Sequence, residues 1–147
     1  MSAQSRGQGD GVASLILELV APDRVLFSGE VSAVVLPGSE GEMTMLPRHV
    51  PVITTLETGL IVATDIQGNE QYLLVLGGFA EITGDKVMVL AERALRLEEL
   101  TRERLEGEIR HLEAVHNSTP NDVLRERAAR GVSRLEQLRD GLPFRRK

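Results

Sequence analysis

One change in the spacing of apolar residues divides this chain of 147 residues, and it limits the possible folds more than any other feature. Up to about residue 94, short apolar or alternating runs recur between glycine, proline, aspartate and asparagine residues. Such runs are typical of the short strands of an all-β sandwich, because successive side chains of a strand point to opposite faces. From about Leu95 the apolar residues are three to four positions apart, which is typical of helices.

The sequence therefore predicts an α+β chain, in which an all-β sandwich of nine or ten short strands precedes an antiparallel helical hairpin. We expect a disordered tail at residues 1–13, the sandwich at 14–94 and the hairpin, with a basic C-terminal end, at 95–147. The tail is rich in glycine, serine and glutamine, so little apolar surface offsets the entropy cost of ordering it.

Two groups of turn residues are expected to interrupt the strands. Ser28-Gly29-Glu30 should separate one strand at residues 24–27 from another at 31–36. Residues 37–51 contain three prolines and two glycines, and are expected to leave the sheet as turns, because proline removes a backbone donor and glycine permits positive φ. The other predicted strands are residues 14–20, 52–56, 60–64, 72–76, 79–83 and 86–90.

The two expected helices are joined by a connection of only a few residues, which predicts that they run antiparallel. The first should stop near residues 116–118, and the second should start at 119–122 with Thr119 as its N-cap. Gly107 and Gly131 each weaken a helix by about 1 kcal/mol relative to alanine. Two helices cannot enclose a core, so the hairpin must dock on its own sandwich or on a partner. The expected apolar positions are Leu97, Leu100, Leu105, Ile109, Leu112 and Val115, then Leu124, Ala128, Val132, Leu135 and Leu138.

The residues that carry chemistry argue against an enzyme. The chain has no cysteine, which excludes disulfides, thiolate zinc sites and cysteine nucleophiles. His111 and His116 are five positions apart and so lie on different sides of a helix, and Gly77-Gly78 lacks the Lys-Ser/Thr of a P-loop. We therefore expect no catalytic residue, no metal site and no cofactor, and we interpret the chain as a binding or coupling module.

Charge is distributed unevenly along the chain. The net charge is −5, but residues 121–147 hold eight Arg/Lys against four Asp/Glu, a net charge of +4 that leaves −9 for residues 1–120. The acidic body opposes phosphate binding, so we expect no nucleic acid partner. No apolar run approaches the roughly 20 residues of a spanning helix, and the N-terminal residues lack the apolar centre of a signal peptide. Membrane contact is therefore expected only through a complex.

Six separate motifs carry a resemblance to a known family. They are L-E-L-V-A-P-D, F-S-G-E-V, P-G-S-E-G-E, P-R-H-V-P, G-G-F-A-E and V-M-V-L-A-E-R-A. In this order and spacing, followed by two helices, they resemble the epsilon subunit of F-type ATP synthases from about Leu15 to Arg139.

The resemblance implies a non-catalytic subunit of a proton-translocating enzyme. In this family a β-sandwich and a helical hairpin sit with the gamma subunit in the rotating central stalk and touch the membrane ring of c subunits. The hairpin can restrain ATP hydrolysis by extending toward the alpha and beta subunits of the catalytic head. The implied location is the cytoplasmic face of the bacterial inner membrane.

Site residues follow from the same motifs by position. Glu42 and His49, together with Glu40, correspond to the surface that faces the c-ring, and we expect one polar turn to present all three. The alternative is that they only solvate and brace the loop. In the extended state, candidate contacts to acidic segments of the catalytic head are Arg125, Arg127, Arg130, Arg134 and Arg139, which could equally form a solvated helix face.

Some bacterial members also bind ATP through an acidic residue and arginines of the two helices. Arg104, Arg130 and Arg134 match that motif here, but Thr101 replaces the acidic residue and Leu105 the alanine. The resemblance therefore does not imply ATP binding for this chain.

A rival hypothesis from a different class is a free-standing adaptor, with no role in ATP synthesis, whose sandwich and hairpin bind one soluble protein.

Overall fold

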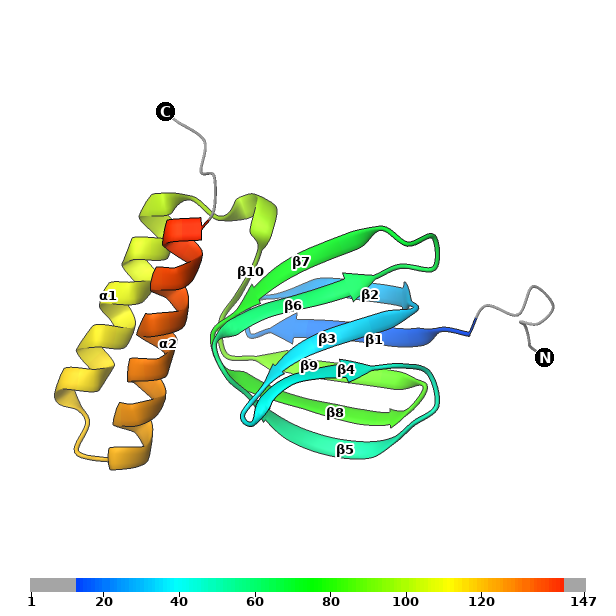
Figure 1. Ribbon diagram of the computed structural model, residues 1–147, viewed down its shortest axis with the longest axis horizontal. Coiled ribbons are helices and arrows are strands. Elements are labelled where there is room, and N and C mark those ends of the chain that lie inside the picture. The colour runs from blue at the N-terminus through cyan, green and yellow to red at the C-terminus, as the bar shows by residue number, and fades with distance from the viewer. Residues whose placement is uncertain (1–12, 142–147) are drawn as a thin grey trace.

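The computed structural model describes residues 13–141, apart from the side chain of His49. A β-sandwich lies beside a pair of antiparallel helices (Figure 1), which confirms the predicted architecture. Of the tail predicted at residues 1–13, only Ala13 is among the described residues, and residues 142–147 of the predicted hairpin lie outside them. The strands are β1 Leu15–Ala21, β2 Arg24–Val31, β3 Ala33–Gly38, β4 Gly41–Met45, β5 His49–Leu56, β6 Gly59–Thr64, β7 Glu70–Val75, β8 Gly78–Gly84, β9 Lys86–Ala91 and β10 Ala94–Arg96.

The strands form one sheet that folds over on itself into two layers. Their order is β10-β7-β6-β3-β5-β8-β9-β1-β2, and β4 pairs with β3. A single residue pair, Gly38 with Leu56, joins β3 to β5 at the corner between the layers. At the opposite seam, the Arg96 side chain donates a hydrogen bond to the Leu26 carbonyl at 3.1 Å, so the two end strands β10 and β2 meet. The sandwich is therefore nearly closed.

Alternating residues of the strands fill the space between the layers. In β1, for example, Leu15, Leu17 and Leu19 are fully buried, while Ile16 between them is exposed. The core is aliphatic, as expected from a chain with three phenylalanines, one tyrosine and no tryptophan.

The predicted break at residues 28–30 is wrong, because β2 continues through it. Glu18 of β1 pairs with Ser28, and Leu17 pairs with Gly29. A Cβ at Gly29 would meet only the Phe27 ring, at the ordinary contact distance of 3.7 Å. The turn falls instead at Ser32, whose hydroxyl donates to the carbonyls of Thr64 and Asp65.

The expectation that residues 37–51 form only turns is also wrong. Gly41 adopts φ 121°, which closes a tight turn at residues 39–40 and lets β4 return along β3. A second turn follows at residues 47–48, where Arg48 has φ 66° and its backbone N–H donates to Asp85 at 2.8 Å. The stretch is therefore mostly a β-hairpin.

The helical region begins later than its spacing predicted. The boundary expected between residues 94 and 95 falls inside β10, and Leu95 pairs with Leu74 of β7. A short 3₁₀ helix at Leu97–Glu99 follows, and α1 spans Arg102–Ser118. Thr101 caps α1 by accepting a hydrogen bond from the Arg104 N–H at 3.0 Å.

The second helix, α2, spans Asp122–Gly141. The prediction that Thr119 is its N-cap is wrong, because Asn121 accepts the hydrogen bond from the Leu124 N–H at 3.0 Å. Thr119 instead ends α1 through a bond from its N–H to the Val115 carbonyl, and its hydroxyl accepts from the Asn121 N–H.

The hairpin docks on the outer surface of its own sandwich. A second apolar cluster joins Leu74 and Leu76 of the β7 region to Leu105 and Ile109 of α1 and Leu135 of α2. The two helices also pack against each other along their length. The described state is therefore the folded-down one, in which the sandwich covers most of the apolar residues of the two helices, whereas Leu124 near the start of α2 remains 45% exposed.

Candidate functional site

Glu40 and Glu42 do not lie beside His49, contrary to the expectation of one shared turn. The turn at residues 39–40 is fixed at the C-terminal end of β5, where the Ser39 N–H donates to the Thr55 carbonyl at 3.1 Å. His49 begins the same strand, eight residues long, so its backbone lies about 20 Å away at the strand's other end. Glu40 and Glu42 are both exposed.

The five candidate arginines of α2 divide into two groups. Arg127, Arg130 and Arg134 face the sandwich: Arg127 donates to the Leu56 carbonyl at 3.2 Å, and Arg130 contacts the Glu57 carboxylate at 3.1 and 3.3 Å. The Arg134 Nε lies 3.7 Å from the Cβ position of Gly59. The other two bind within their own helix region, Arg125 with Asp122 and the Thr119 carbonyl and Arg139 with Asp140.

The residues at the positions of the ATP-binding motif considered above make other contacts in this chain. Thr101, at the acidic position of the motif, caps α1, and Arg130 is paired with Glu57. Arg134 lines a shallow pocket with Gln137, Leu138 and Gly141, and Arg104 is not part of its lining. The arrangement gives no indication of a nucleotide site.

One ion pair with a buried carboxylate was missed from the sequence. Glu108 lies on the apolar side of α1 and accepts hydrogen bonds from the Arg93 guanidinium, one of them at 3.0 Å. These hydrogen bonds raise the pKa of Arg93 above its ordinary value. The signal that would have found this pair is a carboxylate three residues after Leu105 on the face expected to be apolar.

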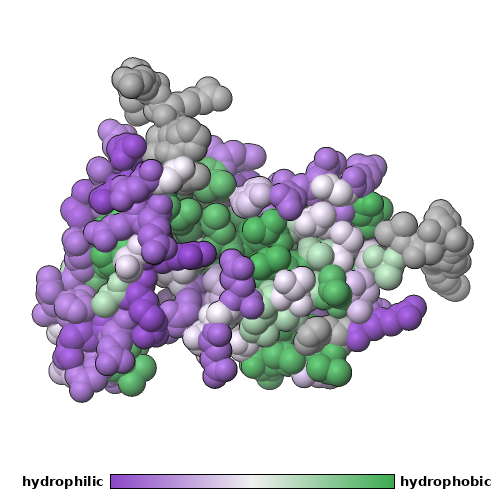
Figure 2. Space-filling model, in the orientation of Figure 1, coloured by the Kyte–Doolittle hydropathy of each residue, from purple (hydrophilic) through white to green (hydrophobic). Residues whose placement is uncertain are grey.

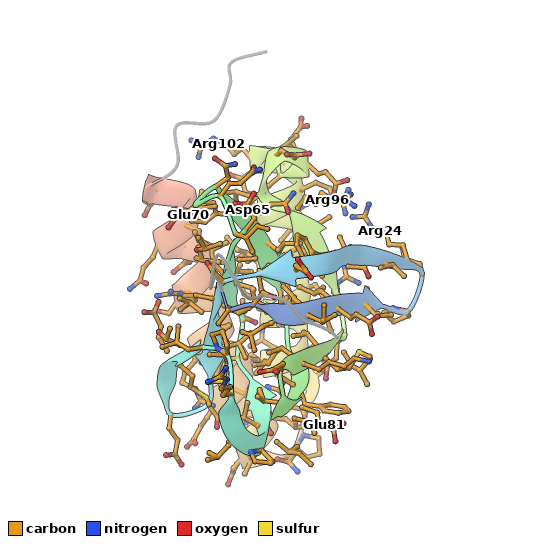
Figure 3. The ribbon with its side chains drawn as sticks, turned by 90° about the vertical axis from the view of Figure 1, so that its right-hand side faces the viewer. Arg24, Asp65, Glu70, Glu81, Arg96 and Arg102 are labelled. Carbon is orange, nitrogen blue, oxygen red and sulfur yellow. The ribbon has the colours of Figure 1, made fainter. Side chains whose placement is uncertain are left out.

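A second charged cluster fastens the beginning of the helical region to the sandwich. Glu99 accepts two hydrogen bonds from Arg24, at 2.7 and 3.1 Å, and one from the Arg96 N–H. These bonds, first among them those from Arg24, lower the Glu99 pKa from 4.5 to about 2. Figure 3 shows Arg24 and Arg96 next to each other at the edge of the sandwich.

A pocket of about 180 Å³ remains between the hairpin and the sandwich. Glu92, Arg93, Glu108 and Arg127 line it with both signs of charge, and His111 lies at its α1 side. Because the two carboxylates face two guanidinium groups, the lining favours neither an anion nor a cation.

An exposed apolar strip crosses the sandwich layer that the hairpin does not cover. Ile53 of β5 is 73% exposed, and Phe79 of β8 pairs with Leu90 of β9, both of them exposed. Figure 2, in which β3, β6 and β7 lie toward the viewer, shows that the outer surface of the hairpin is mainly hydrophilic and that hydrophobic residues also gather over this side of the sandwich.

Two further features are absent from residues 13–141. No helix in this range has the length and apolar character needed to cross a bilayer. Among the same residues, no three His, Asp or Glu side chains are grouped as metal ligands.

Comparisons with known families and curated proteins agree with the architecture. Residues 14–97 match the family model described as ATP synthase, Delta/Epsilon chain, beta-sandwich domain. A protein of Ruegeria sp. (strain TM1040), named ATP synthase epsilon chain, is 39% identical over 125 residues, which cover 82% of this chain and 90% of the relative. A protein of the same name from Chelativorans sp. (strain BNC1) is 38% identical over 85% of this chain and 93% of its own length.

Solved structures share the fold at lower sequence identity. A chain of the Euglena gracilis mitochondrial ATP synthase, from a structure of OSCP, F1 and c-ring, has a TM-score of 0.66 and 24% identity over 95% of this chain and 89% of its own. A chain from the central stalk and c-ring of the Tetrahymena thermophila mitochondrial ATP synthase has a TM-score of 0.56 and 9% identity over 85% of this chain and 96% of its own. At these identities the likeness concerns the fold alone.

Proposed function

The chain belongs to the ATP synthase delta/epsilon family, and from this premise we propose that it is the non-catalytic epsilon subunit of a bacterial, proton-translocating F-type ATP synthase. The observation that carries the proposal is identity of 38–39% to epsilon chains over more than four fifths of this chain, sandwich and helices included. In this role the subunit joins the gamma subunit to the c-ring within the central stalk. It reaches the cytoplasmic face of the inner membrane only through that complex.

Two surfaces of the sandwich are suited to the stalk partners. The β3–β4 turn offers the exposed carboxylates of Glu40 and Glu42 to polar loops of the c-ring. The strip of Ile53, Phe79 and Leu90 is an apolar area that the hairpin leaves uncovered, and we assign it to the gamma subunit, since burial of apolar area stabilises a permanent interface. His49 begins β5, whereas the β3–β4 turn lies at the other end of that strand. A role of His49 in contact with the c-ring is therefore tested separately from that of the two glutamates.

The helical hairpin supplies a regulatory function. In the folded-down state the arginines at positions 127, 130 and 134 lie against the sandwich, so the subunit does not inhibit. When the hairpin extends, the same arginines, with Arg125 and Arg139, become available to acidic segments of the alpha and beta subunits and restrain ATP hydrolysis.

Coexpression with the gamma subunit of the same genome tests the proposal. We expect the two chains to co-elute as a 1:1 complex in size-exclusion chromatography, and to be retained with detergent-extracted membranes only when the remaining subunits are present. Separate elution of this chain at monomer size, with gamma present in excess, would favour the free-standing adaptor instead. A Phe79→Asp variant should lose the complex while keeping the fold, because Phe79 lies outside the sandwich core.

A further inference from the structure

One edge of β4 is open to another chain. The five residues of this strand pair regularly with β3, from Gly38 with Gly41 to Val34 with Met45. Figure 1 shows that β3 lies between β6 and β4, so that β4 is the outermost strand on its side of the layer. Among residues 13–141, no strand pairs with β4 on the side away from β3. The backbone groups on that side can therefore pair with an added strand.

The pairing pattern shows which backbone groups lie on the open side. Pro37 has no N–H, and its carbonyl accepts from the Glu57 N–H at 2.8 Å, so Pro37 does not bond Glu42, its partner in β4. Backbone bonds alternate along an antiparallel pair, so Met43 bonds β3, whereas Glu42 and Thr44 do not. The N–H and C=O groups of Glu42 and Thr44 therefore point toward the open edge.

Two other strands that have an outer edge are interrupted. Pro51 removes an N–H from β5, and the register of that strand shifts between residues 49 and 52. In β2, the Leu26 carbonyl accepts from the Arg96 side chain, and the register with β1 is shifted. Prolines and bulges keep strand edges from pairing. β4 contains neither a proline nor a shift in register, so its open edge is suited to pairing.

The exposed side chains of β4 determine which kind of strand fits beside it. Glu42 and Thr44 are exposed, whereas Met45 is buried in the core. An added strand places one of its side chains beside Glu42, where a basic residue is favoured and an acidic one is repelled. The Glu42 carboxylate stands on the face of the strand and not at its edge, so backbone pairing leaves it accessible. The open edge therefore fits an extended basic segment.

The open edge begins where the apolar strip assigned to the gamma subunit ends. Ser39, in the turn that leads into β4, donates to the Thr55 carbonyl of β5. Ile53, two residues before Thr55, is the most exposed of the three residues of the strip, at 73%. A subunit that covers Ile53 therefore has the beginning of β4 next to it.

We propose that an extended basic segment of the gamma subunit pairs with the open edge of β4 as an added strand. The segment bonds the N–H and C=O groups of Glu42 and Thr44, while the strip of Ile53, Phe79 and Leu90 takes apolar side chains of the same subunit. Backbone bonds give the contact a fixed register, which suits two subunits that turn together. This inference rests on the proposed function for the identity of the partner, but the contact itself is tested separately.

The first experiment measures hydrogen exchange at single amides of the full-length chain by NMR, in the free chain and in its complex with the gamma subunit. In the free chain the amides of Met43 and Met45, which bond β3, should exchange slowly, and those of Glu42 and Thr44 fast. In the complex, exchange of Glu42 and Thr44 should slow at least about 10-fold, because the added strand accepts hydrogen bonds from both. Unchanged exchange of these two amides would overturn the proposal.

The second experiment removes one outward N–H without disturbing the bonds to β3. Thr44→Pro should keep the urea midpoint of the wild type, but should weaken the complex with gamma at least about 10-fold, because a donor is lost and the ring blocks the neighbouring strand. The control is Thr44→Val, which keeps the N–H and should bind gamma like the wild type. Equal affinities of the two variants would contradict strand pairing. If Thr44→Pro does not fold, exchange in the wild-type complex decides the question.

Three outcomes separate this inference from the proposed function. Separate elution of the chain and gamma would contradict both. Co-elution that Phe79→Asp abolishes, without protection of Glu42 and Thr44, would leave the proposed function in place and contradict only strand pairing. Protection of the two amides in the assembled enzyme with its c-ring, but not in the complex with gamma, would contradict the assignment of the open edge to gamma.

Discussion

The Arg93 guanidinium binds Glu108 across the boundary between sandwich and hairpin, and 7% of the Glu108 side chain is exposed against 52% of Arg93. Arg93 lies between β9 and β10, and Glu108 lies in the middle of α1, so the pair ties the first helix to the sandwich at a point distant in sequence from α2. A nearly buried carboxylate without its partner would be costly, because its desolvation is no longer offset.

Arg93→Met should therefore lower the free energy of unfolding by about 2 kcal/mol. The expected value is below that of a fully buried pair, because half of Arg93 is in contact with solvent. Urea denaturation at pH 7 measures the loss, with Arg110→Met, at an exposed position of α1, as the control. Adding Glu108→Gln to Arg93→Met should recover part of the loss, and an equal or greater loss in the double variant would show that the carboxylate was not the cause.

Acid should weaken the attachment of the 3₁₀ helix through Glu99. Its folded-state pKa of about 2 lies below the ordinary value of 4.5, so the ionised carboxylate favours the folded state. This stabilisation is present above pH 4.5 and is lost as the pH falls from 4.5 toward 2. The loss should amount to about 1 kcal/mol of the free energy of unfolding, because solvent screens a partly exposed ion pair. Urea denaturation between pH 5 and 2.5 measures the free energy of unfolding, which should decrease less with falling pH in Glu99→Gln than in the wild type. An equal dependence on pH in the two proteins would contradict the assignment.

Substitutions at Glu42, next to the β3–β4 turn, and at His49, at the opposite end of β5, should affect the coupling of ATP hydrolysis to proton pumping independently. Glu42→Ala is expected to reduce ATP-driven pumping in membrane vesicles without lowering hydrolysis, because Glu42 is proposed to contact the c-ring. Any effect of His49→Ala should add to it, because position 49 lies at the end of β5 about 20 Å, measured along the backbone of that strand, from the β3–β4 turn. A double variant that pumps like the wild type would remove the proposed role of this surface.

Truncation of the hairpin should increase ATP hydrolysis by the assembled enzyme. A deletion from Leu97 onward would remove Glu99 and its ion pair with Arg24 as well as the helices. The cleaner deletion is therefore residues 101–147, which keeps β10 and the 3₁₀ helix. The shortened chain should still co-purify with gamma, and an unchanged hydrolysis rate in that complex would contradict inhibition by the helices.

The sequence was sufficient for the architecture because its two periodicities are local. Alternation along β1 and the spacing from Leu105 to Ile109 each identify an element without knowledge of its neighbours. Leu95 was misplaced because a single apolar residue at the point where the spacing changes fits either period, and only its pairing with Leu74 of β7 shows that it belongs to a strand.

The candidate site was less predictable because it depends on contacts between distant segments. Residues 37–51 contain the turn residues expected, but their strand pairing with β3 follows from register, which composition does not reveal. Arg130 was selected for its charge, whereas its partner Glu57 is 73 positions away in sequence. Gly131 was interpreted as a weakness of the helix, because its contact with Thr58 exists only in the docked fold.

The most direct test uses a disulfide between Thr58→Cys and Gly131→Cys. The Cβ position of Gly131 lies 3.6 Å from the Thr58 Cβ, within the range of disulfides, and the chain has no other cysteine. The same position lies 2.7 Å from Cδ1 of Leu112, the end of a flexible side chain that can turn away to admit the new Cβ. The bond is formed in the isolated subunit, which is then assembled with the remaining subunits, and ATP hydrolysis is measured before and after reduction. The account predicts uninhibited hydrolysis while the bond holds the hairpin on the sandwich, and lower hydrolysis once reduction frees it. Equal rates in the oxidised and reduced enzyme would contradict release of the hairpin as the inhibitory step.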